Sequence, residues 1–226
     1  MVGITRRDDR HRAWRTAAQG LLLSAVLILG SLTTAQPAGK VHLGLRLHVA
    51  EQSDSPVVDE AFISSRVTRA NEIFAPYGVS FEVSSRAPLA ARHALQVSRE
   101  DRDALAEYGA PGAIDVFIVA ALRDVDEPGP DDQPHWRRGV HWHAGPRSRF
   151  VGRHYVILSS IAGLSVLAHE LGHFLGNPEH SHVPGNLMSY EHTDVLPFLD
   201  RSQVARLRRA LTRYLRSGEL RALTSP

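Results

Sequence analysis

Hydrophobic and polar residues alternate along several short stretches of this chain, and each such stretch predicts a β-strand. The odd-numbered positions of 41–49 are all apolar, and a second alternating stretch spans 79–84. A period of two places every second side chain on the same face, against a core. A continuous apolar run at 114–121 predicts a strand buried on both faces. Shorter strands are expected at 140–143 and 155–158.

Apolar residues at spacings of three and four predict helices between these strands. The longest covers 57–75, and a short one is expected at 102–108. A third covers 161–175, where the side expected to be buried consists of Leu164, Leu167, Leu171 and Phe174. A final helix ends at Gly218 and is marked by Val204, Leu207, Leu211, Tyr214 and Leu215.

The order of these elements predicts an α/β or α+β domain, with a mixed sheet and helices packed against it. A chain of 226 residues suits one medium-sized domain and a leader. Hydrophobic residues make up 43% of it and charged residues 22%, which is typical of a globular protein rather than a disordered one. We therefore expect one domain at 36–226 and a separate segment at 1–35.

The segment at 1–35 has the layout of an export signal. A stretch with five arginines precedes an apolar run at 21–32, and the small residues Thr33 and Ala35 fit cleavage before Gln36. The apolar run is shorter than the roughly 20 residues that a membrane span needs. A cleaved signal peptide is therefore favoured over an uncleaved anchor. The pattern predicts a protein that a bacterium exports, and that is either secreted or periplasmic.

Charge and cysteine content exclude several classes of function. The net charge is +2, but 1–35 holds five basic and two acidic residues, so the remainder has 21 basic and 22 acidic residues and a net charge of −1. That balance predicts no nucleic-acid partner, and no stable membrane association once the leader is removed. The chain has no cysteine. A zinc site must therefore use histidine and carboxylate, and no cysteine can block the metal to keep the protein latent.

The segment His-Glu-Leu-Gly-His at 169–173 carries the clearest chemistry. Residues four apart share one face of a helix, so the imidazoles of His169 and His173 can reach the same ion. Zinc held there would lower the pKa of a water to about 7. Glu170, next to the first ligand, would take the proton of that water as general base and pass it to the leaving amine.

The residues that follow carry a resemblance to a known family. Gly176 is expected to adopt a positive φ and end the helix, and Asn-Leu-Met-Ser-Tyr follows at 186–190. HELGHFLGNPEH at 169–180 together with NLMSY resembles the metzincin clan of zinc peptidases, whose pattern is H-E-x-x-H-x-x-G-x-x-H and a methionine turn. The resemblance implies that Met188 lies in a turn beneath the metal. It also implies that Tyr190 reaches the zinc, as in the astacin and serralysin branches, and binds the oxyanion during turnover.

The third zinc ligand is where this sequence departs from the clan. Glu179 occupies the clan's third-ligand position, and His180 follows one residue later. Pro178 restricts Asn177 to extended conformations, in which adjacent side chains point in opposite directions. A loop absorbs one extra residue at little entropic cost. We therefore favour His180 as the third ligand, followed by Glu179 and then His182.

Two further groups of residues allow several interpretations. His141 and His143 flank Trp142, so both should face one side of a strand. Plain surface histidines are favoured, then a strand that lines the substrate, and lastly a second metal site. A calcium site is the alternative to a solvated acidic loop, which is favoured, for Asp124, Asp126, Glu127, Asp131 and Asp132.

Together these features predict a secreted zinc-dependent endopeptidase with one catalytic Zn²⁺ and a protein or peptide substrate. The resemblance implies that 36–226 form one catalytic domain similar to those of astacins, serralysins and matrixins. One alternative is a zinc-binding module without activity on a peptidase scaffold, against which the intact Glu170 argues. The other is a membrane-tethered form of the same protein that retains its leader.

Overall fold

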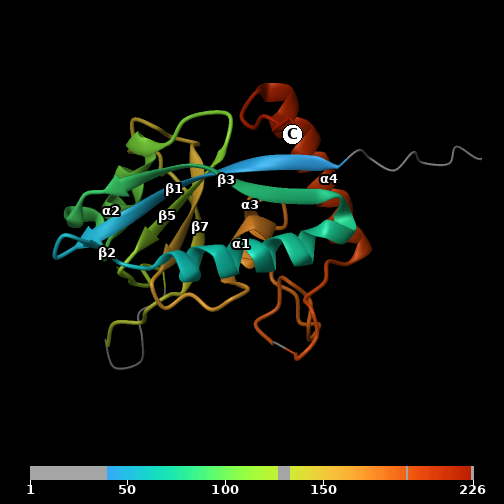
Figure 1. Cartoon of the computed structure of the whole chain (residues 1–226), viewed down its shortest axis with the longest axis horizontal. Coiled ribbons are helices and arrows are strands. Elements are labelled where there is room, and N and C mark those ends of the chain that lie inside the picture. Colours follow the sequence, from blue (N-terminus) through green and yellow to red (C-terminus); the bar gives the residue numbers. More distant parts are fainter. Residues whose placement is uncertain (1–39, 127–132, 192, 225–226) are drawn as a thin grey trace, which may run out of the picture. The chain divides into compact units, whose positions relative to one another are not determined.

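A six-stranded mixed sheet forms the centre of the fold (Figure 1). The computed structural model describes residues 40–126, 133–191 and 193–224, so the leader expected at 1–35 lies outside it. The strands of this sheet are β1 (Val41–Gln52), β2 (Ser55–Pro56), β3 (Val79–Leu89), β5 (Ile114–Val119), β7 (Gly139–His143) and β8 (His154–Ser159). Strands β3, β1, β5 and β8 run parallel in that order, whereas β7 pairs antiparallel with β8 at the edge.

Helices and short 3₁₀ turns connect the strands. The helices are α1 (Glu60–Phe74), α2 (Arg99–Ala104), α3 (Val166–Phe174) and α4 (Arg201–Ser217). The 3₁₀ turns are η1 (Ala75–Tyr77), η2 (Ala91–His93) and η3 (Leu105–Tyr108). Two short strands, β4 (Leu95–Gln96) and β6 (Ala121–Leu122), pair in a small separate sheet. The predicted fold class, a mixed sheet with helices packed against it, is confirmed.

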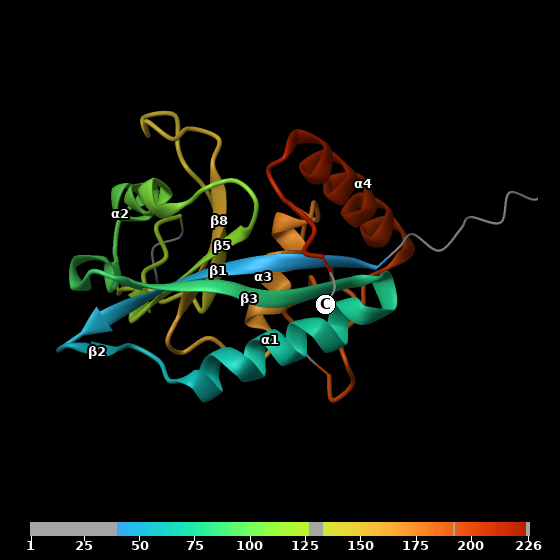
Figure 2. The same ribbon diagram turned by 45° about the horizontal axis from the view of Figure 1, so that its top comes forward.

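The alternation of side chains along the strands separates two cores, one on each face of the sheet. In β5, Val116 and Ile118 join the core that contains residues of α1, α3 and α4. Phe117 and Val119 point the other way, into a core shared with Leu105 of η3. Figure 2 shows α1 alongside the long strands β1 and β3. The candidate site lies on the first of these faces, where α3 packs against β7 and β8.

Helix boundaries differ from the sequence prediction where local capping decides them. The helix predicted at 57–75 begins only at Glu60, because the Asp59 side chain accepts a hydrogen bond from the Phe62 N–H and caps it. The helix predicted at 161–175 begins only at Val166. The prediction that Leu164 is buried was wrong: it is 41% exposed, because it lies in the turn before the helix.

The last helix ends where the sequence predicts. Gly218 ends α4 in the left-handed conformation, with φ +78°. Among the residues that the structure describes, no helix is both long and apolar enough to cross a membrane.

Candidate metal centre

Helix α3 presents His169 and His173 on one face, and backbone carbonyls hold both rings. The Nδ1 atom of His169 lies 2.7 Å from the Leu187 carbonyl oxygen, and Nδ1 of His173 lies 2.7 Å from that of Asn177. A carbonyl oxygen can only accept, so Nδ1 must carry the proton in both rings. The Nε2 atoms are then left as lone-pair donors. Such a contact to the far ring nitrogen is the usual way a protein orients a metal-binding histidine.

The Nε2 atoms of three histidines converge on one point. Nε2 of His173 lies 3.2 Å from Nε2 of His169 and 3.2 Å from Nε2 of His180. Nitrogens bound at about 2.05 Å to one tetrahedral zinc ion stand ~3.3 Å apart, so these spacings fit a shared ion. Burial and the charges of its two neighbours lower the pKa of His173 to about 3. The ring is therefore neutral near pH 7, as a metal ligand must be.

Two contacts bring the loop after α3 back to these rings. Gly176 has φ +94° and ends the helix as predicted, and the Asn177 N–H then donates to the Gly172 carbonyl. Further along, the Ser181 N–H donates to the carbonyl of Met188 at 2.8 Å, which pins the residue directly after His180.

Of the three candidates for third ligand, this loop brings only one to the cluster. His180 joins His169 and His173 in a group whose ligand atoms all lie within 4.8 Å of one another. Glu179 and His182 are exposed and are not members of that group. Glu179, which occupies the third-ligand position of the clan pattern, is therefore not brought to the cluster.

Met188 lies directly beneath α3. It is fully buried, and a Cβ atom placed on Gly172 would stand only 2.6 Å from its sulfur. The glycine between the two helix histidines therefore lets the methionine approach the helix backbone closely. The Met188 N–H donates to Oδ1 of Asn186, whose amide forms a reciprocal, buried pair with the amide of Gln203 in α4. The turn is therefore tied to both α3 and α4.

Glu170 is a buried carboxyl group beside the three histidines. Its side chain is 6% exposed, and burial raises its pKa to about 8. A backbone hydrogen bond from His141 on β7 and the positive charge of Arg137 act in the opposite direction. A divalent cation close by would also favour the ionised form, because an opposite charge stabilises it.

Tyr190 lies against the outer ring of the cluster. Its ring stacks on His180 with 4.3 Å between centroids, and its hydroxyl is 3.4 Å from Nδ1 of His180. The tyrosine is 69% exposed. The structure therefore places the ring of Tyr190 against His180, with its centroid also 6.2 Å from that of His169.

Sequence reasoning missed several groups that shape this site. The carbonyls of Asn177 and Leu187 orient the helix histidines, and no side-chain pattern marks a backbone acceptor. Arg137 lies just before β7, and its charge acts on both Glu170 and His180.

The acidic loop proposed as an alternative calcium site lies partly outside the described residues, which omit Glu127, Asp131 and Asp132. Of the two described members, Asp124 lies 2.7 Å from Nε of Arg137, and Asp126 pairs with Arg99. Protein cations thus already contact the carboxylates of Asp124 and Asp126, and the contacts of these two described residues give no support to a calcium ion.

Comparison with known proteins relies on structure alone, since the chain matches no family model and no curated protein. Mature mirolysin from Tannerella forsythia, solved with a cleaved peptide, is 13% identical with a TM-score of 0.51, over 82% of this chain and 100% of that one. Metalloproteinase-II from Bacteroides fragilis is 17% identical with a TM-score of 0.49, over 78% of this chain. The chain spans only 55% of that protein's length. Archaemetzincin from Methanopyrus kandleri is 20% identical with a TM-score of 0.45, over 76% of this chain and 96% of that one.

Identities this low establish a shared fold and nothing finer. The mirolysin match includes most of the described residues and the whole of the other chain. It agrees with the resemblance carried by the histidine motif and the methionine turn. The chain therefore has the fold of the metzincin-like metallopeptidases.

Proposed function

We propose that the protein is a zinc-dependent endopeptidase whose ion is held by His169, His173 and His180. The observation that carries this proposal is the convergence of three Nε2 atoms at 3.2 Å spacings, with two of the rings fixed by backbone carbonyls. Glu170 adds a buried carboxyl group one residue from the first of these histidines. Three protein ligands and an open fourth position are the arrangement that catalytic zinc sites use.

The chemistry follows from the position of each group. A zinc ion bound here would supply Lewis acidity to the scissile carbonyl and to the attacking water. Glu170 takes a proton from that water at its carboxylate and returns it to the leaving amine. The backbone N–H of His141 holds the carboxylate in place during both transfers. Tyr190, next to His180, is the residue that would donate to the oxyanion.

The substrate and location are part of the same proposal. A peptide substrate fits the position of β7, an edge strand beside α3 to which an extended peptide could add as a further strand. Mirolysin, of the same fold, was solved with a cleaved peptide. The leader pattern at 1–35 supports export, so sequencing the amino terminus of the exported protein should find Gln36 first.

The test combines metal analysis of the purified protein with digestion of a peptide library. Glu170→Gln should keep one zinc at this site and lose roughly 10²–10⁴-fold in kcat/KM, the usual contribution of a general base. Glu72→Gln is a matched control, because Glu72 is a surface carboxylate paired with Arg69 on α1.

Two results would contradict the proposal. If Glu170→Gln cleaves peptides as fast as the parent, the carboxyl group is not the base. If the parent binds zinc at this site but cleaves no member of the library, the alternative of a zinc-binding module without activity gains support.

A further inference from the structure

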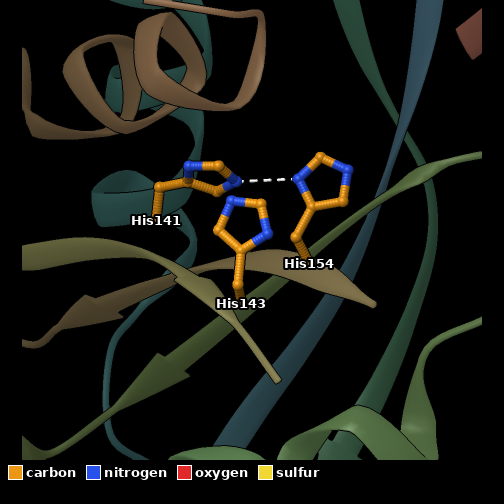
Figure 3. Close-up of side chains that lie close together, drawn as sticks. All are labelled: His141, His143 and His154. Atoms are coloured by element: carbon orange, nitrogen blue, oxygen red, sulfur yellow. Dashed lines mark hydrogen bonds between the residues drawn. The ribbon is translucent and has the colours of Figure 1, made fainter. Parts of the chain in front are cut away.

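A second group of three histidines lies on the sheet, and the proposed mechanism uses none of its side chains. His141 and His143 belong to β7 and His154 to β8, where His143 pairs directly with His154. All three side chains point to the sheet face that packs against α3, because Val156 and Leu158 of β8 join the α3 core and His154 shares their parity. Figure 3 shows the three imidazoles turned toward one another.

The ring nitrogens are close enough to share one ion. Each histidine offers one nitrogen, and these three atoms all lie within 4.8 Å of one another. Nε2 of His141 is 2.8 Å from Nδ1 of His154. These two nitrogens stand closer together than the ~3.3 Å that separates the ligands of one tetrahedral zinc ion, so the two rings must move apart for an ion to bind.

A carboxylate orients one of the rings from outside. Nε2 of His154 lies 2.5 Å from Oε1 of Glu219, which follows α4. An ionised carboxylate can only accept, so Nε2 carries the proton and Nδ1 keeps a lone pair directed into the cluster. This carboxylate–histidine pairing is characteristic of metal sites, where it fixes the ring and makes the ligand nitrogen more basic.

Among the described residues, the side chains of the cluster otherwise share a single hydrogen bond, from Nε2–H of His141 to Nδ1 of His154. For an ion to bind, that proton must move to Nδ1 of His141, a change of tautomer without loss of charge. Burial lowers the pKa of His141, His143 and His154, which favours the neutral imidazole, the form that binds a metal.

Two aromatic rings and several charged or titratable side chains surround the cluster, and His173 of the other centre also acts on His141. The ring of His154 stacks on Phe174 with 4.1 Å between centroids and lies 5.4 Å from the ring of Tyr214. Arg213 acts on His154 as a positive charge and would oppose a cation, whereas Glu219 acts in the opposite direction. His143 is exposed, so a water can complete the coordination from that side.

We propose that His141, His143 and His154 form a second metal site for a divalent transition-metal ion of the zinc class. Three imidazoles with a water suit zinc and its borderline neighbours rather than calcium or magnesium, which prefer oxygen ligands. The ion links β7 to β8 and, through Glu219, to the segment after α4. This site is separate from the centre at His169, His173 and His180, and it does not depend on the proposed activity.

The test is the number of zinc ions bound per chain, measured by equilibrium dialysis of the full protein against buffered Zn²⁺. The parent should bind two, and His143→Ala should bind one. His42→Ala is the matched control, because His42 also lies on a strand and contacts Glu82, but belongs to neither cluster, and it should keep two. His169→Ala should remove one ion and leave the second bound, which separates the two sites.

A second variant tests the site without removing a histidine, so that a folding defect in His143→Ala cannot explain the result. Glu219→Gln leaves all three histidines in place and should weaken the second ion alone, by roughly 10–100-fold, as removal of an outer partner does. A parent that saturates at one ion, or a His143→Ala variant that still binds two, would overturn the proposal. The three rings would then form a hydrogen-bonded cluster without metal.

Discussion

The contact between Gly172 and Met188 allows a quantitative test of how the methionine turn supports α3. Replacing Gly172 by alanine adds one methyl group, and its Cβ would stand 2.6 Å from the Met188 sulfur and 3.5 Å from a Leu187 methyl carbon. The first distance is far below van der Waals contact, so the buried methionine must move. His169 and His173 lie on the same helix, so the displacement should also be felt at the proposed metal ligands.

Two effects of this substitution oppose each other. Overpacking of a well-packed core costs about 1–3 kcal/mol, whereas alanine in a helix interior is favoured over glycine by about 0.5–1 kcal/mol. From the middle of each range, Gly172→Ala should lower the free energy of unfolding by about 1 kcal/mol. In a Met188→Ala background the obstacle is gone, and the same substitution should raise it by about 0.5–1 kcal/mol.

The assay is a double-mutant cycle, measured by urea unfolding of the metal-free protein so that zinc binding does not contribute. The expected coupling between the two positions is about 2 kcal/mol. Gly163→Ala is a control, because a Cβ there meets Val166 only at the ordinary distance of 3.8 Å and should show no coupling to Met188. If Met188→Ala does not fold, Met188→Val also lacks the sulfur and can replace it. An equal effect of Gly172→Ala in both backgrounds would refute the close-contact argument.

Three further predictions concern the proposed zinc site. His180→Ala should weaken zinc binding by more than roughly 100-fold, measured by competition with a chelator, whereas Glu179→Ala and His182→Ala should bind zinc about as tightly as the parent. A larger loss of affinity in Glu179→Ala would make the centre a two-histidine, one-carboxylate site. Tyr190→Phe should lower kcat by roughly 10²–10³-fold with little change in KM or zinc content, because an oxyanion contact forms mainly in the transition state. An unchanged kcat would mean that Tyr190 only packs against His180. Removal of zinc with a chelator should lower Tm, because an ion at 1,000 times its Kd contributes about 4 kcal/mol, and an unchanged Tm would argue against a bound ion.

Much of the secondary structure follows from local patterns that the chain carries wherever it folds. The alternation at 41–49 and the apolar run at 114–121 correspond to β1 and β5. Boundaries were less predictable, because capping and turns compete with hydrophobic periodicity at the ends of elements. Apolar Leu164 extends the helical pattern of α3 but lies in the turn before it, where the Val166 N–H donates to the Gly163 carbonyl.

Part of the candidate site can likewise be predicted from local sequence, and part depends on tertiary contacts. Helical spacing alone puts His169 and His173 on one face, and glycine alone allows the positive φ of Gly176. The choice among three side chains in the following loop is not local, because a hydrogen bond from Ser181 to Met188, across seven residues, decides which of them faces the helix.

The histidines of the sheet show the same limit. Alternation alone indicates that His141 and His143 lie on the same side of a strand. From the sequence alone, plain surface histidines are the favoured interpretation of this pair. Their meeting with His154 depends on how β7 pairs with β8, and the carboxylate of Glu219 comes from 65 residues further along the chain. The sequence by itself thus determined the residue types, the helix face and the turn. Only the tertiary structure decided which side chains meet and which are buried, because strand pairing and loop closure join residues that no local period relates.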